Sequence, residues 1–162
     1  MMDEVIKKIS SYNIFNNLFP GILLGVGITK WSSFSITSGE VIVDLFLFYF
    51  FGLTASRVGS LIIEPLLDAV GFAKRVDYSE YIKAEKQDSK LPVLTEVNNV
   101  YRTLCAALIV LLGVKGFDIL VIKIEFLNQR KSLLVVVLLI FLFLWSYRKQ
   151  TKYIVERVKG VE

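Results

Sequence analysis

The sequence contains no histidine and only one cysteine, Cys105, among its 162 residues. One cysteine excludes a disulfide within the chain, and without histidine no Cys/His zinc site can form. The absence of histidine also removes the commonest general base and the usual pH-sensitive side chain. No Walker A, GxGxxG, GxSxG or HExxH pattern occurs. We therefore expect a protein that is not an enzyme and that holds no metal and no other cofactor.

Apolar residues, in contrast, are abundant and unevenly distributed. They make up 54% of the chain, aromatic residues make up 13%, and the mean hydropathy is +0.58. They gather in long blocks, as in helices that cross a bilayer. The expected fold class is all-α: a polytopic membrane protein in which residues 1–162 form a single transmembrane domain.

The apolar blocks predict four transmembrane helices. A span needs about 20 residues to cross a hydrocarbon layer of about 30 Å. Pro20 should kink the first span or end its first turn, and Ser10 or Ser11 could cap its start. The expected spans cover residues 13–29, 41–63, 100–116 and 132–147, with a loop at 64–99 and a charged tail at 148–162.

The loop at 64–99 should itself contain helical structure. A helix is expected to start at Asp77, with Glu80 three residues later completing a variant of the capping box. A further helix should start after Ser89 or Lys90, because Pro92 suits the first turn of a helix.

The end of the third span can be interpreted in two ways. Lys115 and Asp118 interrupt the apolar run, but they lie three residues apart and could pair on one helix face. Alternatively, the span ends at Gly116 and residues 117–127 form a short extended or interfacial element. We favour the second interpretation.

The distribution of basic residues predicts the orientation in the membrane. Of the 19 Lys and Arg residues, 14 lie in the N-terminal segment, the region from Arg57 to Arg102 and the tail. The positive-inside rule therefore places both termini and the loop at 64–99 in the cytoplasm. Trp31 and Trp145 fall at the expected membrane edges, as in an aromatic belt.

A polar face is expected at the cytoplasmic ends of the second and third spans. An arginine at the bilayer centre costs about 2.5–3.5 kcal/mol, so Arg57 should find partners or extend to the headgroups. If the two spans are antiparallel neighbours, Arg57 could meet Glu96 or Asn99, and Glu64 could meet Arg102. The hypothesis is a polar seam that fixes helix packing, formed by Arg57, Ser60, Glu64, Glu96, Asn99 and Arg102.

Small residues indicate a second packing surface. Gly21 and Gly25 recur four residues apart in the first span, as do Gly52, Ser56 and Ser60 in the second. Such spacing lets two helices approach closely. It does not say whether the contact lies within one chain or between chains.

Four segments of the sequence carry a resemblance to a known family: residues 11–24 (SYNIFNNLFPGILL), 56–72 (SRVGSLIIEPLLDAVGF), 77–82 (DYSEYI) and 94–106 (LTEVNNVYRTLCA). Over residues 10–115 the chain resembles small bacterial four-span membrane proteins that include the membrane subunit of the Kiwa anti-phage defence system. The best matching residues are Arg57, Glu64, Pro65, Glu96, Asn98, Asn99, Tyr101 and Arg102; the resemblance assigns them no role.

The resemblance implies an inner-membrane homo-oligomer, with a tetramer favoured. It also implies a cytoplasmic effector protein from the same operon, itself DNA-binding, and a response to phage attack at the envelope. No direct binding of nucleic acid by this chain is expected.

Two functions follow as hypotheses. The first is a membrane scaffold and sensor whose cytoplasmic loop docks the effector. The second is a pore-forming effector that depolarises the cell. The residues assigned to partner docking are Asp77, Tyr78, Glu80, Tyr81, Lys83 and Lys86, and those assigned to a pore or gate are Asp44, Lys115 and Asp118.

Overall fold

The structure, a computed structural model, describes the backbone of residues 2–159 and the side chains of residues 16–159. The described residues form helices and connecting segments and contain no strand, which confirms the all-α prediction. The elements are α1 (Met2–Trp31), α2 (Val41–Val58), the π-helical turn η1 (Gly59–Ile63), α3 (Glu64–Ala69), α4 (Tyr78–Glu85), α5 (Leu91–Lys123) and α6 (Glu125–Lys159).

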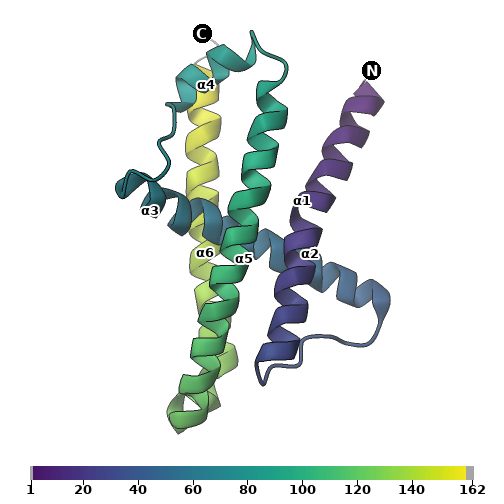
Figure 1. The fold of residues 1–162 in the computed structure, drawn as a ribbon, viewed down its shortest axis with the longest axis vertical. Helices are drawn as coiled ribbons and strands as arrows, with labels where there is room; N and C mark the ends of the chain where they lie inside the picture. Colours follow the sequence, from purple (N-terminus) through teal and green to yellow (C-terminus); the bar gives the residue numbers. More distant parts are fainter. Residues whose placement is uncertain (1, 160–162) are drawn as a thin grey trace.

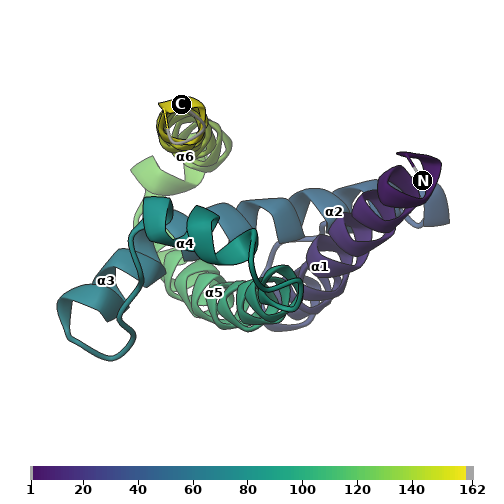
Figure 2. The ribbon, with the colours of Figure 1, turned by 90° about the horizontal axis from the view of Figure 1, so that it is seen from above.

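Three long helices run along the molecule and a fourth crosses them. In Figure 1, α1, α5 and α6 extend between the two ends of the molecule, whereas α2, η1 and α3 form one helical rod that lies across it. Figure 2 shows this rod passing between α5 and α6. The sequence had suggested that the second and third apolar segments are antiparallel neighbours, but they do not lie side by side along their length. They meet at a crossing.

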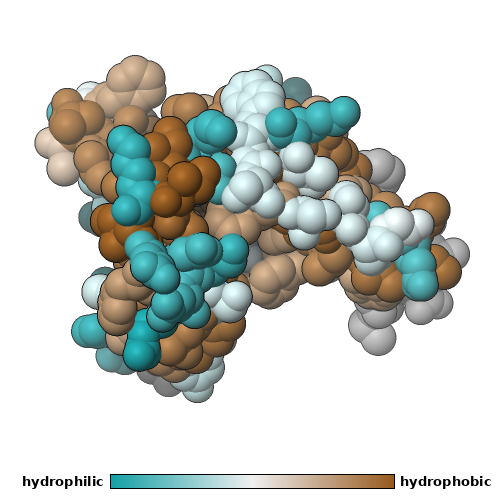
Figure 3. All heavy atoms as spheres, turned by 90° about the horizontal axis from the view of Figure 1, so that it is seen from below, coloured by the Kyte–Doolittle hydropathy of each residue, from teal (hydrophilic) through white to brown (hydrophobic). Residues whose placement is uncertain are grey.

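Three helical segments are long and apolar enough to span a membrane: Val41–Ala69, Leu91–Lys123 and Glu125–Lys159. Their apolar stretches are mostly exposed in the single chain, as expected for helices that contact lipid or another subunit. Figure 3 views the end formed by the α5–α6 turn and shows a largely apolar surface with separate hydrophilic patches. These features support a membrane protein with transmembrane helices.

The core lies where α1, α2 and α5 meet. It is built from small and branched apolar side chains, and glycines bring α1 and α2 into backbone contact. A Cβ added at Gly21 would lie 1.7 Å from the carbonyl oxygen of Phe48, and one added at Gly52 would lie 1.7 Å from that of Asn17. The close contact expected from the small residues therefore exists within one chain. The buried cluster comprises Leu24, Ile28, Ala55, Ile63, Ala106, Ala107 and Leu111.

Helix α1 is longer and more continuous than expected. It begins at Met2, so Ser10 and Ser11 do not cap its start, and Pro20 lies inside it without ending it. The side chain of Pro20 is fully buried, so packing against the neighbouring helices offsets the backbone hydrogen bond that proline cannot donate.

The favoured interpretation, in which the helix ends at Gly116 and residues 117–127 form a separate short element, is wrong. Helix α5 continues to Lys123, and Ile124 alone separates it from α6. Lys115 and Asp118 pair at 3.9 Å on one face, which was the alternative interpretation. Residues 148–159 of the charged tail belong to α6, which continues through them without a break.

The two helix starts predicted in the loop are at the correct positions, but the capping hydrogen bond expected from Asp77 is absent. Asp77 is the N-cap of α4, but its side chain makes no capping hydrogen bond, so the capping box does not form. Lys90 is the N-cap of α5, and Pro92 lies in its first turn as expected.

Candidate functional site

The candidate site begins with a local break in the hydrogen bonding of the crossing rod. In η1 the amide of Glu64 donates to the carbonyl of Gly59, a bond between residues five apart. The next donor in this pattern would be residue 65, which is a proline and has no N–H. The carbonyl of Ser60 is therefore left without a helical donor, and the Nζ of Lys149 on α6 donates to it at 2.7 Å. The Ser60 hydroxyl accepts a second bond from the same Nζ at 2.8 Å.

A glycine turn after α3 brings a further cation to the same place. Gly71 has φ +72°, and its amide donates to the carbonyl of Asp68 while the amide of Phe72 donates to that of Leu67. This is the Schellman arrangement that ends a helix and reverses the chain. The reversal lets Arg75 fold back onto α3.

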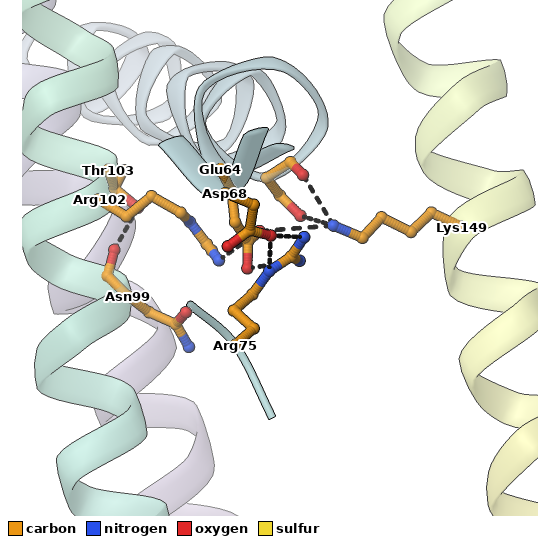
Figure 4. Close-up of polar contacts among 8 residues, drawn as sticks. Glu64, Asp68, Arg75, Asn99, Arg102, Thr103 and Lys149 are labelled. Atoms are coloured by element: carbon orange, nitrogen blue, oxygen red, sulfur yellow. Dashed lines mark hydrogen bonds and ion pairs between the residues drawn. The ribbon is translucent and has the colours of Figure 1, made fainter. Parts of the chain in front are cut away.

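Glu64 lies at the centre of a group of charges from three parts of the fold (Figure 4). Its Oε1 lies 2.9 Å from Nη1 of Arg75, and its Oε2 lies 3.1 Å from Nη1 of Arg102 and 3.4 Å from Nζ of Lys149. The side chains of Glu64 and Arg102 are each only 19% exposed. Together with Ser60 and Asp68, these residues are called the Glu64 cluster below. The cluster joins the crossing rod to both α5 and α6.

Asp68 completes the cluster by binding the same arginine. Both Nε and Nη2 of Arg75 contact its Oδ2. Partial burial by itself lowers the pKa of Arg75, but the hydrogen bond with Asp68 and the charge of Glu64 outweigh it, so the pKa is raised. Arg75 therefore stays charged and holds the segment after α3 against the rod.

The structure brings together part of the expected polar seam. The Glu64–Arg102 contact is present, and Ser60 belongs to the same cluster. Arg57 forms no hydrogen bond or ion pair with Glu96, Asn99 or another residue in the part of the chain that the structure describes, and its buried Nε lacks a partner. The pairing proposed for Arg57 is therefore not formed in the single chain.

Three cluster residues were not identified from the sequence: Asp68, Arg75 and Lys149. Lys149 was placed in a charged tail, although it follows Trp145 by four residues on what is one continuous helix. The signal that could have found it is Pro65. A proline at the end of a helical apolar run frees a carbonyl, and a nearby cation is a suitable donor.

The residues assigned to partner docking divide into two groups. Tyr78 and Tyr81 face the chain itself: their rings stack at 6.5 Å, and the ring of Tyr78 lies 4.9 Å from that of Tyr153 on α6. Glu85 also lies 3.9 Å from Arg157. The exposed members, which remain accessible on α4 and its flanks, are Asp77, Glu80, Lys83 and Lys86.

The residues assigned to a pore or gate have partners of their own. Asp118 is 3% exposed and accepts hydrogen bonds from the amide of Ser33, at 3.1 Å, and from its hydroxyl. Asp44 accepts bonds from the amide and hydroxyl of Ser38 at 2.7 and 2.8 Å. Lys115 pairs with Asp118, whereas Asp44 contacts Ser38 and neither of these two residues. These carboxylates anchor the segment between α1 and α2 to the helices.

The described side chains contain no group of three or more Asp, Glu or Cys that could hold a metal ion. What the Glu64 cluster offers is charge pairing and hydrogen bonding between helices. No protein-family model matches the chain, and no curated protein or solved structure matches it.

Proposed function

We propose that this chain is an inner-membrane scaffold and sensor subunit of a bacterial anti-phage defence complex. It forms a homo-oligomer, with a tetramer favoured, and docks a cytoplasmic effector protein through α4 and the segments beside it. The defence role is suggested by the sequence resemblance to the Kiwa membrane subunit. The membrane location is supported by the three long apolar helices.

The observation that carries the proposal is the connection between α4 and the membrane helices. Helix α4 contacts the last turns of α6 through Tyr78 and Tyr153, and α6 contacts the crossing rod through Lys149. The chain also runs directly from α3 through Arg75 to α4. A shift of α5, α6 or α2 in the bilayer would therefore alter the Glu64 cluster and the position of α4 together. Such a linked arrangement is what a sensor needs to pass a signal to a docked protein.

The proposed topology has four spans with both termini in the cytoplasm. Figure 1 is compatible with it, because the start of α1, helix α4 and the end of α6 lie at one end of the molecule, and the segment between α1 and α2 lies towards the other. The crossing rod would then be a strongly tilted span. The pore alternative has less support, since Asp44 and Asp118 are engaged by Ser38 and Ser33.

The docking role is tested by co-purification of the protein encoded next to this chain. Replacing Asp77, Glu80, Lys83 and Lys86 together with serine should abolish co-purification, because these exposed charges are the accessible part of α4. The matched control replaces Lys123, Glu125, Arg130 and Lys131, at the opposite end, with serine and should retain the partner. Retention by the α4 variant, with membrane insertion unchanged, would contradict the docking role.

A further inference from the structure

The charges around the Glu64 cluster do not balance. Four cations gather there, Arg57, Arg75, Arg102 and Lys149, but the cluster supplies only the carboxylates of Glu64 and Asp68. Arg57 belongs to this group because it lines one small cavity together with Ser60 and Lys149. A partly buried group with two excess positive charges is costly unless an anion joins it.

Donors at this place also lack acceptors. The Nε atoms of Arg57 and Arg102 are buried and have no hydrogen-bond partner among the described residues. A buried donor left without an acceptor costs about 1–3 kcal/mol. The three hydrogens of Lys149 are already directed to the two Ser60 oxygens and to Glu64, so Lys149 itself is satisfied. Arg102 pairs with Glu64 through Nη1, whereas Arg57 has no hydrogen bond or ion pair among the described residues.

A small cavity lies beside Arg57, between the crossing rod and α6. Its volume is about 20 Å³, room for one oxygen-sized group. Tyr153 and Gln150, whose side chains carry hydrogen-bond donors, also line it, and Leu61 is its apolar lining residue. The remaining lining residues are Ser60, Ser146 and Lys149. A polar cavity of this size would admit an oxygen of an anionic group while the rest of the ligand stays outside.

The position along α6 indicates which anion is at hand. The lining residues of α6 begin directly after Trp145, which is 62% exposed and ends the apolar block of that helix. Exposed tryptophans at such a boundary mark the headgroup level of a bilayer. Basic pockets between helices at the cytoplasmic surface bind the headgroups of anionic lipids. The phosphates of lipids are therefore the anions closest to this cavity.

We propose that the cavity formed by Arg57, Gln150, Tyr153 and Ser60 binds a phosphate oxygen of an anionic phospholipid. Arg57 supplies the charge, and the amide of Gln150 and hydroxyl of Tyr153 orient the phosphate. Binding neutralises part of the excess positive charge of the Glu64 cluster and joins the crossing rod to α6 more firmly. The site requires the membrane location and is independent of the defence role.

The test measures apparent affinity by thermal shift of the purified protein in neutral detergent. Phosphatidylglycerol, phosphatidylcholine and inorganic phosphate are each titrated. Phosphatidylglycerol should raise the melting temperature of the unmodified chain and phosphatidylcholine should not. Arg57→Gln should weaken the apparent affinity for phosphatidylglycerol about tenfold or more, the effect of losing one charged hydrogen bond. Tyr153→Phe, a milder change that keeps the ring, should weaken it in the same direction.

The control is Arg148→Gln. It removes an equal charge from an exposed position on α6, next to the cavity-lining residues Lys149 and Gln150. An equal loss in Arg148→Gln and Arg57→Gln would overturn the site, because only general attraction to anionic lipid would remain. Full retention of affinity in both Arg57→Gln and Tyr153→Phe would overturn it as well. Stabilisation by inorganic phosphate equal to that by phosphatidylglycerol would keep the anion site but overturn its assignment to lipid.

Discussion

The crossing of α1 and α2 should tolerate no side chain at Gly52. In a Gly52→Ala variant, the new Cβ would lie 1.7 Å from the carbonyl oxygen of Asn17, whereas ordinary contacts begin near 3.4 Å. The two helices would have to separate by about that difference, because a backbone oxygen, unlike a side chain, cannot rotate away. Overpacking of this kind costs about 1–3 kcal/mol, and this contact falls at the upper end of the range.

The same substitution at Gly113 provides the control. Nothing lies within 4 Å of a Cβ added there, so Gly113→Ala should be neutral or stabilise the helix by up to about 1 kcal/mol through helix propensity. Unfolding is measured in mixed micelles by titration with sodium dodecyl sulfate, with tryptophan fluorescence as the signal. A Gly52→Ala variant as stable as the unmodified chain, or two equal losses, would refute the close crossing.

Three further predictions concern the polar contacts and use the same unfolding measurement. Glu64→Gln removes the carboxylate shared by three cations and should lower the free energy of unfolding by about 2–3 kcal/mol. The control Glu156→Gln breaks an exposed pair with Lys152 and should change that free energy by less than about 0.5 kcal/mol. Similar losses in the two variants would contradict the central role of Glu64. Lys149→Met keeps the length of the side chain but leaves the Ser60 carbonyl without its donor, so the free energy of unfolding should fall by about 1–3 kcal/mol. An unchanged free energy of unfolding would show that water replaces the ammonium group. Asp118→Asn should cost about 1–2 kcal/mol because Ser33 then meets a neutral acceptor, and an unchanged stability would mean that this carboxylate does not hold the α1–α2 segment.

Local patterns in the sequence were sufficient for several features of the fold. The apolar blocks predicted long helices. The four-residue spacing of Gly21 and Gly25, and of Gly52, Ser56 and Ser60, predicted a close helix contact. Of the expected polar face, Ser60 and Glu64 do take part in contacts with other helices, and Glu64 does meet Arg102. Each of these predictions came from a residue pattern within one helix, where periodicity is a strong signal.

Features that depend on how the helices meet could not be obtained in this way. Asp118, the carboxylate that seemed to interrupt the third span, is buried in α5 and accepts hydrogen bonds from Ser33, 85 residues away in the sequence. The crossing of the rod between α5 and α6 has no periodic signature. Arg75 reaches Glu64 because the turn at Gly71 reverses the chain. Lys149 reaches it because it donates to the Ser60 carbonyl on another helix, a contact that the sequence of α6 does not reveal.

The central claim is that the chain crosses the membrane with α4 on the cytoplasmic side and the α1–α2 segment on the outer side. It is tested by single cysteines at Ser35 and at Asp88 in a Cys105→Ser background, labelled in spheroplasts with a maleimide that cannot cross membranes. The account predicts labelling at position 35 in intact spheroplasts and at position 88 only after the membrane is permeabilised. Equal labelling of both positions before permeabilisation, or protection of both, would contradict it.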